Sequence, residues 1–225
     1  AGFTMSILKM EFIELYFSIA FEQRIKTDFG LKGLAVAMDR PPFYLSGGLY
    51  YSSEGVYNGM LTVRFQKFSL LALASYGKLP GSGLASFFAY LAVSYPLGGT
   101  PAFFVNGLAA GLGIHRGLRL PDLKHVQTFP LIEAAMGKGR EIEDAAEAME
   151  NMDSVIYMSE GNYFVSAGIR FSCFGMIDAF ALLNIQFKAR TEISLLGVAD
   201  ASLPAKVKKP VAFIRLALRL VFAPE

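Results

Sequence analysis

The chain has 225 residues, of which 53% are hydrophobic and 18% are charged, and its formal net charge is +2. The apolar share is above the usual one and can supply a sizeable core, whereas so small a charge, without a basic stripe, argues against a nucleic-acid-binding protein. The single cysteine, Cys173, excludes an intramolecular disulfide, and no Asn-x-Ser/Thr sequon occurs, so we expect an intracellular (cytoplasmic) protein.

The first clear strand pattern lies at residues 61–66, where Leu61, Val63 and Phe65 alternate with polar residues. Such alternation is typical of a strand with one buried face. Residues 68–76 form a second run, and the glycines and proline of "GKLPGSG" predict a turn after it.

The run at residues 85–96, "ASFFAYLAVSYP", is apolar on both faces, and a strand of this kind needs cover on both sides. The longest apolar stretch, residues 84–97, is too short to cross a membrane as a helix. The first residues also lack the basic start and cleavage site of a signal peptide.

The stretch "FFVNGLAAGLGIHRG" at residues 103–117 allows two interpretations. Gly107, Gly111 and Gly113 have the spacing of a dinucleotide-binding turn. That turn must open a helix, and "IHRGLRLPD" is a poor helix; a Tyr-x-x-x-Lys pair for proton transfer is also absent. We therefore predict a strand whose small residues admit the close approach of another layer.

Helical spacing is confined to residues 130–153. "PLIEAAMG" has a proline in its first turn and a terminal glycine, and "GREIEDAAEAMENM" alternates apolar with acidic residues at helical spacing. We expect one short helical insertion here. Its carboxylates are interpreted as a solvated helix face.

Four further runs with strand alternation follow, at residues 163–172, 176–188, 191–203 and 212–222. Strands on both sides of a helical excursion indicate antiparallel meanders, not βαβ units. The predicted fold is therefore mainly β, with long antiparallel meander sheets as a curved sheet or a sandwich. We expect residues 1–225 to form a single β-rich domain or a fragment of a larger chain.

The most polar cluster after the glycine-rich run contains His115, Arg116, Arg119 and Lys124. Arg116 and Arg119 could bind an anion or carboxylate as a fork, so these four residues are candidates for contact with an anion or a partner. Two histidines ten residues apart are weak evidence for a metal site, and a solvated loop is the alternative.

No catalytic, cofactor or metal site is predicted. The apolar neighbours of Cys173 favour a small core residue over a reactive thiolate. P-loop, HExxH, GxSxG and CxxC motifs are all absent. We therefore expect no enzyme activity and no cofactor.

Six segments occur in the order found in one family: "LKGLAVAMDRPPFYLSGGLYY", "FSLLALASYGKLP", "FFVNGLAAGLGIHRGLRLP", "NYFVSAGIRFSCFGMIDAFALLNIQF", "ISLLGVADASLP" and "VAFIRLALRLVFAPE". Over about residues 31–225 the chain resembles the domain of unknown function 6603 family of large bacterial and fungal proteins. The resemblance implies a large parent chain and supplies no activity or site residue.

Three functions agree with these features. The first is a non-enzymatic β-rich structural or interaction module, whose partners would be other segments of the parent chain or other proteins. The second is a hydrophobic-ligand carrier that holds lipid in an apolar groove. The third, a membrane β-barrel, requires polar residues facing the lumen on every strand, and the run at 86–96 argues against it.

Overall fold

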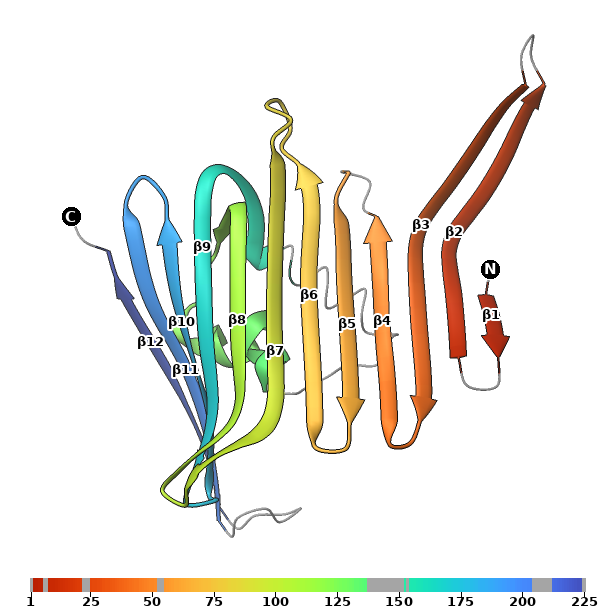
Figure 1. The fold of residues 1–225 in the computed structure, drawn as a ribbon. Coiled ribbons are helices and arrows are strands. Elements are labelled where there is room, and N and C mark those ends of the chain that lie inside the picture. The colour runs from red at the N-terminus through yellow and green to blue at the C-terminus, as the bar shows by residue number, and fades with distance from the viewer. Residues whose placement is uncertain are drawn as a thin grey trace.

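The computed structural model describes residues 2–5, 8–21, 25–51, 55–136, 152, 154–203 and 212–223. Twelve strands form one sheet in which every strand pairs antiparallel with its neighbours in sequence (Figure 1). Their bounds are β1 Gly2–Met5, β2 Leu8–Phe21, β3 Ile25–Arg40, β4 Phe43–Tyr51, β5 Tyr57–Phe65, β6 Phe68–Lys78, β7 Ala85–Thr100, β8 Phe103–Leu118, β9 Ile156–Cys173, β10 Ile177–Phe187, β11 Thr191–Leu203 and β12 Ala212–Phe222. The mainly β, antiparallel prediction is confirmed, in the form of a single curved sheet.

Several strands are longer than the sequence pattern predicts. β7 and β8 have 16 residues each and β9 has 18. β8 and β9 continue past a register shift between Ile114 and Arg116, where His115 has a positive φ of 51°. At this irregularity the single residue His115 of β8 stands opposite four residues of β9, 159–162, so simple alternation stops there although the strand does not.

Between β8 and β9 the described residues include the 3₁₀ helix η1, Leu123–Thr128, and the short helix α1, Pro130–Ala135. α1 begins with proline at its first turn, as predicted. The 3₁₀ helix starts before the predicted helical segment, and the acidic part of that segment lies outside the described residues. None of the described helices is long and apolar enough to cross a membrane.

The helices lie inside the curve of the sheet. α1 contacts β7, β8 and β10, while η1 contacts β11 and β12 on the other side of the curve. Val126, Leu131 and Ile132 are fully buried there, against Tyr90 and other side chains of the sheet. The face that the helices cover is called the concave face, and the opposite one the convex face.

Candidate functional site

Strand register decides which side chains share a face, because residues paired directly across an antiparallel sheet point to the same side. Tyr90 of β7 pairs with Leu73 of β6 and with Gly111 of β8, and Gly111 pairs with Ser166 of β9. Tyr90 lies under α1, where its hydroxyl donates a hydrogen bond to the Leu131 carbonyl over 2.9 Å. All these positions therefore belong to the concave face.

Buried polar side chains gather on the concave face. By register, this face holds every buried polar residue in the described part of the chain: Ser46, Asn58, Thr62, Ser75, Ser86, Arg116, Ser166, Asn184, Gln186 and Ser194. Several of them bond to one another or to the backbone. Ser166 donates to Asn184 Oδ1 over 2.6 Å, and Gln186 Oε1 accepts from the Leu118 amide over 3.1 Å.

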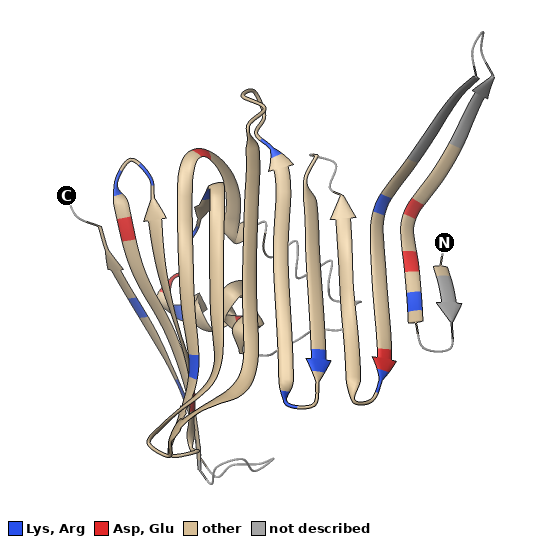
Figure 2. Cartoon of the chain, viewed as in Figure 1, with Lys and Arg blue, Asp and Glu red and all other residues tan. Residues whose placement is uncertain are grey.

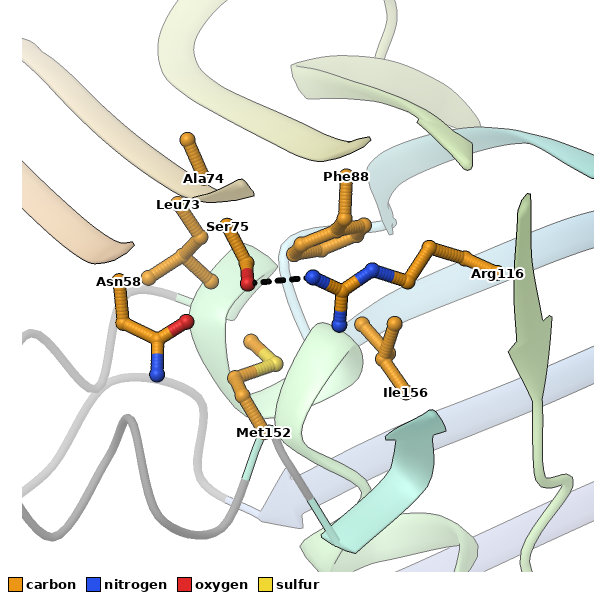
Figure 3. Close-up of a pocket in the computed structure, with 8 residues that line it drawn as sticks. All are labelled: Asn58, Leu73, Ala74, Ser75, Phe88, Arg116, Met152 and Ile156. Atoms are coloured by element: carbon orange, nitrogen blue, oxygen red, sulfur yellow. Dashed lines mark hydrogen bonds between the residues drawn. The ribbon is translucent and has the colours of Figure 1, made fainter. Parts of the chain in front are cut away.

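Arg116 is the most deeply buried charge in the described residues, with 2% of its surface exposed. Its Nη2 donates to Ser75 Oγ over 2.8 Å, across a small cavity also lined by Phe88 and Ile156 (Figure 3). The cavity holds about 10 Å³, which is barely the room that one water molecule needs. The guanidinium therefore links β8 to β6 across β7 on the concave face.

The four residues predicted to contact an anion or a partner have different neighbours. Arg119 is exposed; its Nη1 donates to the Ser154 carbonyl over 2.8 Å, and its guanidinium lies over the Tyr157 ring. His115 is half-buried and its Nδ1 accepts from the Gly161 amide, while Lys124 is exposed on η1. Arg116 and Arg119 thus donate to separate partners in this structure, and the anion-contact hypothesis stays a prediction.

Two arginine–aspartate pairs cross the concave face near one end. Arg170 holds Asp178 through two hydrogen bonds of 2.7 and 3.2 Å, and Arg215 holds Asp200 through two of 2.5 Å. Asp178 and Asp200 are directly opposite each other on β10 and β11. These groups, except Arg215, line a polar hollow of about 440 Å³ with Ser202 and Asn106. Among the described residues, no group of three or more metal-binding side chains is close enough to hold an ion.

The glycine-rich stretch is a strand, β8, as predicted. A Cβ atom on Gly113 would lie 2.2 Å from the Phe164 ring, and one on Gly107 would lie 2.5 Å from the Val93 carbonyl oxygen. Gly111 has a similar relation to Tyr90, at 2.9 Å. The glycines therefore make room for large rings and the neighbouring backbone on the concave face.

The convex face is apolar from strand to strand. From β4 to β11, the convex positions that lie away from the strand ends carry only aliphatic, aromatic, alanine or glycine residues. Leu61, Leu91, Leu108, Leu183 and Leu216 are 39–62% exposed there. Isolated exposed leucines are ordinary, whereas a contiguous apolar surface of this extent is unusual on a monomeric soluble protein.

Sequence reasoning missed this surface as a unit. Apolar alternation was visible in each strand, but the side that each apolar set takes depends on pairings between distant residues. Tyr90 and Leu131, for example, are 41 residues apart. With the strand register known, one contact between a strand and the helices is enough to assign the face of every other strand position.

Comparison with known proteins gives one match. The model of a family described as a family of unknown function (DUF6603) matches residues 1–225, which extends the resemblance seen over residues 31–225 to the whole chain. No curated protein matches the chain. No solved structure matches it either.

Proposed function

The chain belongs to the DUF6603 family, and from this premise we propose that it is a non-enzymatic structural module. It acts as a curved wall: the convex face packs against apolar material, and the concave face holds polar groups and the helices. The observation that carries this proposal is the convex face, which is uncharged across β4–β11 between the strand ends. Partners are then other segments of a parent chain, other proteins, or lipid.

The transfer of convex side chains from water to apolar surroundings lowers the free energy, so burial of the convex face is favoured. Each leucine side chain moved from water to apolar surroundings gains about 1.5–3 kcal/mol. Leu183 of β10 and Leu195 of β11 are direct cross-strand partners on the convex face, and Leu183 is 40% exposed. Dozens of such positions left in water would favour association of the folded sheet with any apolar phase.

A hydrophobic-ligand carrier is the second candidate. It needs an apolar channel or groove that encloses acyl chains. The larger described hollows on the concave side are instead lined by charged residues: Arg170, Asp178 and Asp200 in one, and Arg119, Lys188, Glu192 and Arg219 in another. Water suits such a lining better than acyl chains do, so we favour the wall.

The test adds two positive charges to either the convex or the concave face. Leu183→Lys with Leu195→Lys places two cations on the convex face, and the matched control, Ser69→Lys with Ser202→Lys, places two on half-buried concave positions. Partition of each purified chain into a detergent-rich phase is the measurement. The convex variant should partition about a hundredfold less than the unaltered chain, because about 3 kcal/mol of apolar contact is lost. Equal partition of all three chains would refute the proposal.

A further inference from the structure

We infer that the convex face contacts the hydrocarbon core of a lipid bilayer. This inference rests on the proposed wall, because it names the apolar material that the wall covers. Its evidence is the distribution of aromatic, aliphatic and charged side chains over the height of the sheet.

A row of aromatic side chains crosses the convex face at one end of the strands. The pairing is continuous from β4 to β10, and each residue of the row lies directly opposite the next. The row consists of Tyr51, Tyr57, Tyr76, Phe87, Ile114, Tyr163 and Phe187. Six of these seven positions are aromatic. Tyrosine and phenylalanine in such a row are typical of the level where a bilayer meets water, since an aromatic ring is apolar and a tyrosine hydroxyl seeks water.

A second aromatic row crosses the other end of β4, β5 and β6. Phe43 pairs with Phe65, and Phe65 pairs with Phe68. On each of these three strands the two rows are eight residues apart, as from Tyr57 to Phe65 on β5. Eight residues of strand rise about 26 Å at ~3.3 Å per residue. This agrees with the apolar band of strand-built membrane proteins, about 25 Å tall with an aromatic girdle at each border.

The charges complement those of a bilayer. Between the two rows, the described convex positions of β4–β6 are uncharged. Among the described convex positions of these strands, charge comes at the strand end, at Lys78 of β6 (Figure 2), whereas Arg64 of β5 lies on the concave face opposite Ser69. Lys67 lies in the turn between these strands. Lysine at these levels can reach lipid headgroups, while the convex band between the rows meets only acyl chains.

The apolar concave side of β7 does not oppose this inference. Phe88, Tyr90 and Ala92 belong to the core, beneath the helices inside the curve, and the other concave positions of β5 and β9 include Asn58, Thr62 and Ser166. The inner face thus carries an apolar core around the helices together with polar side chains, while the outer face between the aromatic rows is uncharged, as expected of strands that meet lipid on their outer face.

Curvature favours lipid over a second copy of the chain. Two convex faces touch along a line, so a pair of copies would leave most of the band exposed. Fluid acyl chains follow a curved wall and cover its whole height. In hydrocarbon the free edges of β1 and β12 would leave backbone groups unpaired, so we expect further strands to pair with both edges in the bilayer.

The test measures depth in vesicles. In a Cys173→Ser background, single cysteines at Tyr57, Leu61 and Phe65 of β5 carry an environment-sensitive dye, and the whole chain is folded into dioleoylphosphatidylcholine vesicles. Lipids brominated near the chain end or near the headgroup quench the dye. Leu61→Cys should lose most emission to the deep bromines, and Tyr57→Cys and Phe65→Cys to the shallow ones. Leu218→Cys and Arg219→Cys, neighbours on opposite faces of β12, form the matched control, and only Leu218→Cys should be quenched.

Each remaining outcome overturns the inference. Shallow quenching at all three β5 positions would mean that the sheet lies on the bilayer surface. No quenching by any lipid, with detergent partition intact, would mean that protein covers the face, which leaves the wall proposal standing. Loss of both quenching and detergent partition would remove the wall proposal as well.

Discussion

The two faces of β7 carry similarly apolar side chains that end in different surroundings. On the concave face, Phe88 and Tyr90 are 3% and 1% exposed in a core shared with the helices. On the convex face, Leu91 is 43% exposed. The difference shows that apolar residues in this chain have two roles. One set holds the protein together, and the other set forms an outer surface.

Consecutive leucines of β10 give the largest expected contrast between the faces. Leu182 is fully buried on the concave face, whereas Leu183 is 40% exposed on the convex one. Leu182→Ala should lower the free energy of unfolding by about 2–5 kcal/mol, because it opens a cavity. Leu183→Ala should lower it by less than about 1 kcal/mol. Denaturant titration of both variants in one detergent checks the contrast, and similar losses would contradict the assignment of faces.

The glycines of β8 give the next largest effect. Gly113→Ala places a Cβ atom 2.2 Å from the Phe164 ring, which has to move within a packed core. We expect a loss of about 1–3 kcal/mol in the free energy of unfolding. Leu112→Ala, on the convex face one residue before, is the control and should cost less. If Gly113→Ala leaves thermal unfolding unchanged, Phe164 does not lie over β8.

The Arg116–Ser75 hydrogen bond tests how much a buried polar contact on the concave face contributes to stability. Ser75→Ala removes an acceptor from a buried charged donor, and we expect a loss of about 1.5 kcal/mol. Ser69→Ala on the same strand and face is the control, since Ser69 is only half-buried. Chemical denaturation measures both, and equal stabilities would show that Arg116 does not depend on Ser75.

The smallest effect concerns the rim of the concave face. Asp200→Asn weakens the paired hydrogen bonds with Arg215, and both side chains are partly exposed, at 22% and 32%. Such pairs contribute about 0.5 kcal/mol, and salt screens them. The difference in unfolding free energy between variant and unaltered chain should therefore shrink at high salt. A large, salt-independent loss would place this pair in a drier environment than the structure does.

Local sequence predicted the strands well where alternation is unbroken, as at Leu61–Phe65 and along β10. It predicted the proline start of α1 and rejected the dinucleotide interpretation of Gly107, Gly111 and Gly113. It did not predict which side chains of β8 change face at His115, because the register shift there reverses the alternation.

The candidate surface was harder to predict than the strands. The aromatic row joins residues from Tyr51 to Phe187, and only the register brings them into line. Likewise, the polar sequence neighbours of Arg116 predicted contact with an anion. The burial of Arg116 comes from Ser75 and Phe88, both on other strands. Which residues form the candidate surface therefore depends on long-range strand pairing, which a single sequence does not reveal.

A cysteine scan along β12 tests the central claim most directly. Described residues of this strand are largely exposed on both faces, and Ala217, which packs against the core, is left unlabelled, so labels at the other positions from Ile214 to Leu220 should not disturb the core. Each label is quenched by a nitroxide-bearing fatty acid dissolved in the detergent micelle. We predict strong quenching at Ile214, Leu216, Leu218 and Leu220 and weak quenching at the labelled positions between them. Uniform quenching, or a period other than two residues, would contradict a sheet of which only the convex face meets the apolar phase.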